Sequence, residues 1–125
     1  MIRGKNDLGE RLLEYGARLI KVVESLPNTL VGRRVADQLL RSGTSAGANY
    51  EEACGAESKN DFVHKLQIVL KEMRESTYWL RLLVTSGKVS AVRIADLLDE
   101  SHQLCAILSK SVATAKGKAK AYARA

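Results

Sequence analysis

The sequence contains few of the residues that mark strands, tight turns or disulfide-stapled folds. Among its 125 residues there is one Pro, one Trp, one Phe and two Cys. Hydrophobic residues still make up 46%, which is enough apolar surface for folding rather than disorder. The remainder is rich in Leu, Ala, Val, Glu, Lys and Arg. The straight-chain residues and Ala among them lose little conformational entropy in a helix. The composition therefore predicts one helical domain, because the chain is too short for two.

Long apolar runs, secretion signals and clustered metal ligands are also missing. No run approaches the ~20 apolar residues that cross a bilayer, and the first residues lack the apolar core of a secretory signal. A cytoplasmic protein without a membrane partner is therefore expected. Cys54 and Cys105 lie among apolar neighbours without C-x-x-C spacing, so each is expected to pack as a small free thiol. His64 and His102 have no companion ligands at metal spacing, so no metal or other cofactor is expected.

Apolar residues recur at alternating steps of four and three along four segments, which is the spacing of one helix face. Asp7 followed by Glu10 forms an N-terminal cap, and Pro27 ends the first segment. Later, Gly87 and Ser90 mark a helix end and a helix start. The pattern predicts helices over residues 8–25, 30–56, 61–86 and 90–113.

Four long helices joined by short connections predict an all-α, antiparallel, up-down-up-down four-helix bundle over residues 1–115. The sustained four-three spacing predicts left-handed coiling of the helices around each other. No segment shows the alternating pattern of a strand.

The positive charge is concentrated near the end of the chain. The formal net charge is +6, and the segment from Ser109 onward has 5 basic and no acidic residues. Residues 116–125 are expected to form a basic, frayed tail. Such charge favours a phosphate-bearing partner, RNA or DNA, although the chain has few aromatic residues for base stacking. The candidate nucleic-acid-binding residues are Arg33, Arg34, Lys110, Lys116, Lys118, Lys120 and Arg124.

The segment RSGTSAGANYEEA, residues 41–53, contains G-x-S-x-G, the nucleophile-elbow pattern of α/β-hydrolases. Asp61 or Asp96, and then His102, follow Ser45 in the order of a catalytic triad. An elbow needs a strand before the serine, whereas the helical spacing here continues through Ser45. We therefore predict an unbroken helix and a non-catalytic protein.

Gly43 and Gly47 lie four residues apart on one face of this predicted helix. Two glycines cost roughly 2 kcal/mol of helix propensity relative to Ala. Close contact with a neighbouring helix, or a local kink, would offset that cost.

Asn49 falls on the apolar stripe of the second predicted helix, where a polar side chain needs hydrogen-bond partners. Glu52 or Glu75 would supply acceptors, and Arg41 would pair with either carboxylate. A polar network fixing the register of the second and third helices is expected, with acid–base chemistry by paired carboxylates as the alternative. The predicted network contains Arg41, Ser45, Asn49, Glu52 and Glu75.

These motifs resemble the four-helix bundle proteins encoded within intervening sequences of bacterial 23S ribosomal RNA genes. The resemblance covers about residues 8–90 and rests on an R-S-x-T-S-x-x-A-N-x-x-E-A segment followed by K-x-D-F and E-x-x-E-S. The matching residues are Arg41, Ser42, Thr44, Ser45, Ala48, Asn49, Glu52, Ala53, Lys59, Asp61, Phe62, Glu72, Glu75 and Ser76.

The resemblance implies a left-handed antiparallel four-helix bundle that assembles as a homopentamer. It also implies kinship with the accessory variability determinant of diversity-generating retroelements, which binds nucleic acid and reverse transcriptase. No enzymatic activity is established for the family. A homo-oligomeric nucleic-acid-binding or ribonucleoprotein accessory protein is therefore expected. The alternative is an assembly or adaptor module with a protein partner, favoured by apolar residues such as Trp79 and Leu82 on the third helix.

Overall fold

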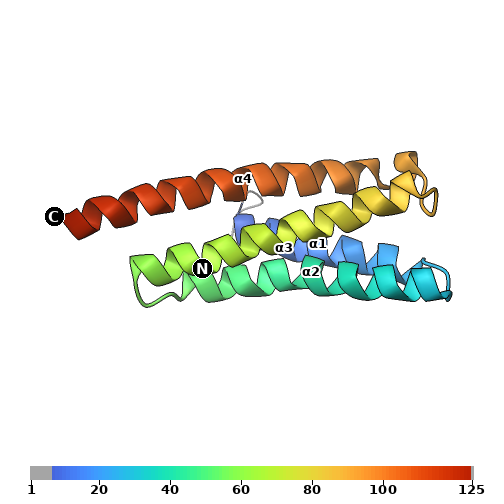
Figure 1. Cartoon of the computed structure of the whole chain (residues 1–125), viewed down its shortest axis with the longest axis horizontal. Coiled ribbons are helices and arrows are strands. Elements are labelled where there is room, and N and C mark those ends of the chain that lie inside the picture. The colour runs from blue at the N-terminus through green and yellow to red at the C-terminus, as the bar shows by residue number, and fades with distance from the viewer. Residues whose placement is uncertain (1–6, 125) are drawn as a thin grey trace.

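The structure is a computed structural model that describes residues 7–124, apart from the side chain of Tyr122. These residues form four α-helices and no strand (Figure 1). Their bounds are α1 (Leu8–Glu24), α2 (Leu30–Cys54), α3 (Lys59–Thr85) and α4 (Ala91–Arg124).

The helices pack as a ring in chain order. α1 packs on α2, α2 on α3 and α3 on α4, and α4 meets α1 over a shorter stretch, while α2 and α4 lie diagonally across the bundle. The chain reverses direction at each connection (Figure 1). The predicted all-α antiparallel bundle is confirmed, and the left-handed sense of its coiling stays a prediction.

Local capping explains where the helices begin. The side chains of Asp7, Thr29 and Ser58 each accept a hydrogen bond from the backbone N–H three residues later, at 3.2, 3.1 and 3.0 Å. Each bond satisfies one of the free N–H groups of a first turn. After α3 the chain turns at Gly87, whose φ of +76° suits a residue without Cβ.

The core is filled by the residues of the four predicted stripes. Its largest fully buried side chains are Tyr15, Leu12, Leu19, Leu39, Leu66, Met73, Leu80, Leu104 and Leu108. Gly43 lies in the middle of this core, where a Cβ would come within 2.1 Å of the Leu19 Cδ2 atom. The predicted close helix contact is therefore confirmed at Gly43.

The predicted end of the last helix, at residue 113, is wrong. α4 continues to Arg124 with one kink at Ile94, so the expected frayed tail is helical as far as the described residues reach. Lys and Ala are good helix formers, and Val112 and Ala115 bury their side chains. The C-terminal half of α4 (red) lies at the same end of the bundle as the start of α3 (green) (Figure 1).

Candidate nucleic-acid interface

The serine of the G-x-S-x-G segment lies in the middle of a helix. α2 runs unbroken through Ser45, so the strand and sharp turn of a nucleophile elbow do not precede it. The other two triad candidates are also apart from it, because His102 and Asp96 are exposed on α4, which lies diagonally across the bundle from α2. Asp61 lies 3.9 Å from the Lys65 ammonium at the start of α3.

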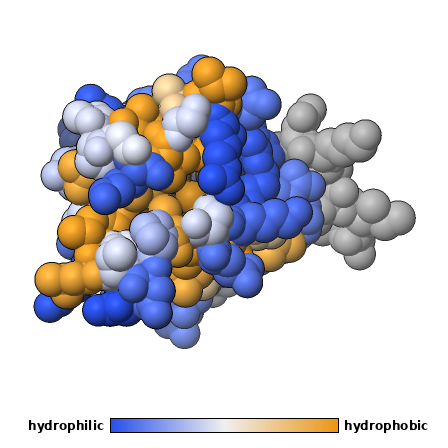
Figure 2. All heavy atoms as spheres, turned by 90° about the vertical axis from the view of Figure 1, so that its right-hand side faces the viewer, coloured by the Kyte–Doolittle hydropathy of each residue, from blue (hydrophilic) through white to orange (hydrophobic). Residues whose placement is uncertain are grey.

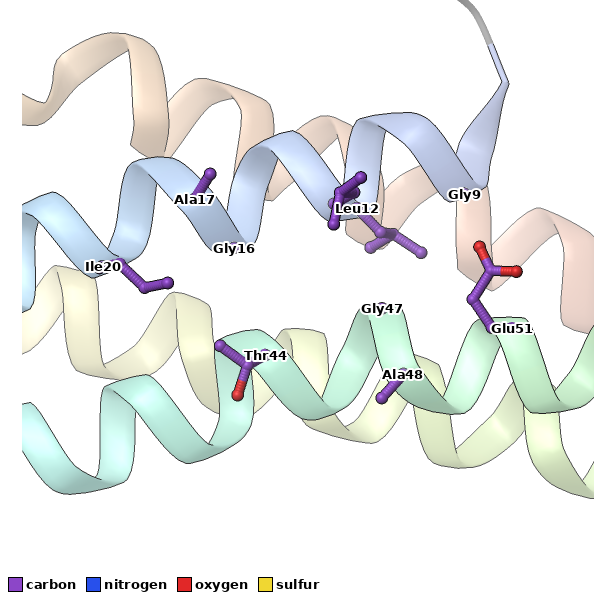
Figure 3. A pocket seen from close by; sticks show the side chains of 10 residues that line it. Gly9, Leu12, Gly16, Ala17, Ile20, Thr44, Gly47, Ala48 and Glu51 are labelled. Atoms are coloured by element: carbon purple, nitrogen blue, oxygen red, sulfur yellow. The ribbon is translucent and has the colours of Figure 1, made fainter. Parts of the chain in front are cut away.

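An apolar groove runs between α1 and α2, on the outer side of the glycines (Figure 3). Gly9 and Gly16 from α1 and Gly47 from α2 contribute no side chains to it, and its volume is about 380 Å³. Leu13 and Ile20 also line it and are 66% and 41% exposed. We call this surface the apolar groove.

Part of the predicted polar network forms between α2 and α3. The Arg41 guanidinium donates to the Glu72 carboxylate at 3.1 Å and to the Glu75 carboxylate. Glu75 also accepts a hydrogen bond from the Trp79 indole at 3.1 Å. The pKa of the Glu75 carboxyl is lowered below its ordinary value. The hydrogen bond from Trp79 is the larger cause and the hydrogen bond from Arg41 is the next.

Asn49 and Glu52 do not join this network, contrary to prediction. The Asn49 amide donates at 2.9 Å to the backbone carbonyl of Ser45, one turn back in the same helix. This local bond satisfies the amide without a carboxylate. Glu52 is exposed on the outside of α2.

A second polar cluster lies in the core and is not in the prediction. The Tyr15 hydroxyl lies 2.5 Å from the Ser76 hydroxyl and donates to the Ser101 hydroxyl at 3.4 Å. Thr77 contacts Ser101 and donates to the carbonyl of Met73 at 2.8 Å. Every buried side-chain N or O atom in the described part of the chain has a partner. Because α1, α3 and α4 each contribute, the cluster favours one register of these three helices.

The most distinctive surface lies between α3 and α4 and is positively charged. Two adjoining hollows are lined from α3 by His64, Gln67, Lys71 and Arg74, and from α4 by Lys116 and Lys120. Neither hollow is lined by a carboxylate. We call this surface the basic groove.

The cations of the basic groove are not neutralised by nearby carboxylates. Within the described residues, Lys71, Arg74, Lys116 and Lys120 form no ion pair. The carboxylates of α3 lie elsewhere: Asp61 pairs with Lys65, and Glu72 and Glu75 pair with Arg41. Lys71 acts on Glu75 only as a minor influence that lowers the pKa of that carboxyl.

The structure separates the seven cations that the sequence suggests. Lys116 and Lys120 line the basic groove, whereas Lys110 and Lys118 line a different hollow beside Phe62. Arg33 and Arg34 are exposed near the start of α2 and line neither hollow, and Arg124 is exposed at the last described turn. Sequence reasoning missed Lys71 and Arg74, although they continue a four-three series along the outer face of α3.

The cysteines and the possible metal ligands lie within the described residues 7–124. Both thiols are free, but Cys54 is exposed at the end of α2 rather than packed, and Cys105 is half-buried. No group of three or more His, Cys, Asp or Glu in these residues is placed to hold a metal ion. No helix in the same range is both long enough and apolar enough to cross a membrane.

The geometry defines a four-helix bundle with a basic groove on one side and an apolar groove on another. The chain matches the 23S rRNA-intervening sequence proteins over residues 6–110. It belongs to this family, as the sequence motifs predict. No curated protein matches the chain.

One similar solved structure is a protein with unknown function from the S23 ribosomal protein family of Bacteroides thetaiotaomicron. It shares 33% sequence identity with this chain and superposes with a TM-score of 0.78. The match covers 84% of this chain and 97% of that one. The likeness therefore extends over most of the bundle in both proteins.

Proposed function

We propose that this protein is a non-catalytic accessory protein that binds the phosphate backbone of RNA or DNA in the basic groove. The observation that carries the proposal is a groove with four cations and no lining carboxylate. Lysine and arginine side chains in such a position release counterions from a nucleic acid when they contact its phosphates. The family's name refers to 23S rRNA, which makes structured ribosomal RNA a suitable first probe.

The separation of charge on α3 supports this proposal. A protein can be nearly neutral over most of its length and still attract a polyanion, because the local field depends on where the charges lie. Here Glu72 and Glu75 pair with Arg41 on α2, whereas Lys71 and Arg74 line a hollow shared with α4. A backbone running along the groove would meet cations from both helices.

The test is a salt titration of binding to a labelled RNA hairpin and a DNA hairpin of the same sequence. A groove variant replaces Lys71, Arg74, Lys116 and Lys120 with Ala. We expect it to bind more weakly and to reduce the magnitude of the slope of log K against log salt by about 2.8 to 3.6, since each of the four lost phosphate contacts contributes about 0.7 to 0.9.

A matched variant controls for net charge. It replaces Arg33, Arg34, Lys110 and Lys118 with Ala, which removes the same number of charges from outside the groove. This control should keep most of the affinity and most of the salt slope. Equal losses in both variants, or salt-insensitive binding by the unmodified protein, would contradict a defined site.

The second candidate function is self-assembly, and the family resemblance implies that the assembly is a homopentamer. It is favoured by the apolar groove, where Leu13 and Ile20 leave apolar surface in contact with water. By contrast, Trp79 and Leu82, which first suggested an interface, are half-buried. We propose that a second copy of the chain covers the apolar groove.

Sedimentation velocity tests the assembly proposal. Leu13→Glu with Ile20→Glu places two charges in the apolar groove and should shift the protein to a smaller species. Val92→Glu is the control, because Val92 is 88% exposed and lies outside the groove. Val92 lies at the start of α4, at the end of the bundle where α1 connects to α2 and α3 to α4. The surface at this end mixes apolar and polar groups (Figure 2). A monomeric unmodified protein at micromolar concentration would refute the proposal.

A further inference from the structure

Tyr78 continues the outer series of α3 that lines the basic groove. The series runs in steps of four and three through six exposed or half-buried positions, with no carboxylate among them. Its members are His64, Gln67, Lys71, Arg74, Tyr78 and Arg81. Of the aromatic side chains that the structure describes, Tyr78 alone is exposed, at 54%.

Two guanidinium groups flank this ring on the same helix face. Arg74 precedes Tyr78 by four residues and Arg81 follows it by three, so both lie next to it on the helix surface. The two arginines are about 10 Å apart along the helix axis at 1.5 Å per residue. Both are exposed, and neither forms an ion pair within the described residues.

The Tyr78 ring rests against a side chain that is itself held in place. The rings of Tyr78 and Trp79 meet edge to face, with centroids 5.2 Å apart and planes at 76°. The Trp79 indole donates to Glu75, and Glu75 pairs with Arg41. A contact surface that is already ordered loses less entropy when a ligand binds.

An exposed aromatic ring between two cations matches the repeating chemistry of a nucleic-acid strand. Each base of a strand has a phosphate on either side, and a base stacks on an aromatic ring only when it is free of its own stack. Duplex base pairs in the basic groove would offer phosphates but no free base face. An unpaired nucleotide would offer both.

We propose that Tyr78 stacks on one unpaired base of the bound strand while Arg74 and Arg81 hold its flanking phosphates. This inference rests on the proposed function and specifies its ligand: a nucleic acid whose paired region lies in the basic groove and whose unpaired nucleotide reaches Tyr78. The low aromatic content of the sequence is compatible with this proposal, because one exposed ring is enough to stack on one base.

The experiment uses the full chain and two labelled RNA duplexes that differ by one bulged nucleotide, together with their DNA counterparts. The unmodified protein should bind the bulged duplex about tenfold more tightly than the paired one, the usual effect of stacking one base. Tyr78→Leu should remove this preference and leave the salt-dependent binding of the paired duplex intact. Tyr78→Phe keeps the ring and should keep the preference.

A fluorescent base makes the stacking visible directly. With 2-aminopurine at the bulge, binding should quench its emission for the unmodified protein and for Tyr78→Phe, but not for Tyr78→Leu. The RNA and DNA arms show whether the sugar matters.

Three results would overturn the inference, and they differ from a failure of the proposed function. They are equal affinity for bulged and paired duplexes, an unchanged preference in Tyr78→Leu, and a change in sedimentation with Tyr78→Leu at unchanged nucleic-acid binding. The last would assign the ring to a protein interface. If instead neither duplex binds, or if the groove variant binds both duplexes as tightly as the unmodified protein does, the proposed function itself is wrong.

Discussion

The two glycines of GTSAG should respond in opposite directions when each is replaced with Ala. A Cβ at Gly43 would lie 2.1 Å from Leu19 Cδ2 and 3.3 Å from the Ser76 hydroxyl oxygen, whereas a Cβ at Gly47 would meet Leu12 at 3.7 Å. The 3.7 Å distance at Gly47 is an ordinary van der Waals contact, whereas the 2.1 Å distance at Gly43 is a clash. Leu19 is fully buried, so its side chain cannot turn into solvent to make room for the added methyl group.

The magnitudes follow from two opposing terms. Either substitution gains up to about 1 kcal/mol of helix propensity. At Gly43 the added methyl group overpacks the core, which typically costs about 1 to 3 kcal/mol and often more where relaxation is blocked. We expect Gly43→Ala to lower the free energy of unfolding by about 1 to 2 kcal/mol and Gly47→Ala to raise it by roughly 0.5 to 1 kcal/mol. The difference corresponds to roughly 8 °C in Tm for a domain of this size.

Chemical denaturation followed by far-UV circular dichroism measures both free energies. Because Gly47 lines the apolar groove, the measurement is made at two protein concentrations, so that an effect on assembly appears as a change between them. Leu19→Val combined with Gly43→Ala should cost less than the sum of the single variants, since the smaller side chain makes room. A Gly43→Ala protein at least as stable as Gly47→Ala would refute the packing argument.

Two further predictions concern titratable groups. Burial raises the pKa of the Tyr15 hydroxyl above its ordinary value of 10.0, so its stabilising effect is complete below pH 10 and is lost as pH rises towards the folded-state pKa. Tyr15→Phe should therefore cost about 1 to 2 kcal/mol at neutral pH, and the difference from the unmodified protein should shrink in alkaline denaturation curves. The lowered pKa of Glu75 means that its contribution is present above pH 4.5 and is lost only as pH falls through the lower folded-state pKa. Trp79 emission should change in that acidic range and not in Glu75→Gln; a change that persists in the variant would contradict the assignment.

The first three helices could be predicted to within two residues because their limits depend on neighbours in sequence. Asp7 and Ser58 are capping residues that act three residues away, and Pro27 stops α1 locally. The predicted end of α4 at residue 113 is wrong because a concentration of basic residues is typical of a frayed tail, whereas the Ala residues between Lys116, Lys118 and Lys120 are strong helix formers. Burial of Ala115 against the bundle is a tertiary effect that spacing alone does not reveal.

The polar clusters were harder to predict because they depend on how far one helix is shifted along another. Tyr15, Ser76 and Ser101 all lie on the predicted apolar stripes, so each could be placed in the core from sequence. That their hydroxyls meet at one level is set by the register of three helices. For Asn49 the error was different, because a partner one turn back in its own helix was overlooked in favour of distant carboxylates.

The basic groove shows why net charge along the sequence is a poor guide to the partner of a helical protein. Up to residue 108 the chain has 15 basic and 14 acidic residues. This nearly balanced count, taken alone, argues against a polyanionic ligand. A helix, however, sorts its residues by angle, and α3 places Glu72 and Glu75 on the flank of Arg41 while Lys71 and Arg74 line the opposite groove. Glu72 and Glu75 are largely offset by Arg41, so they weaken the positive field of the groove less than unpaired carboxylates would, although Lys71 still acts on Glu75. The cations of α3 and α4 therefore present a stronger positive field to a ligand than the residue count implies. The outer face of each helix has to be examined with the same periodicity as its core face.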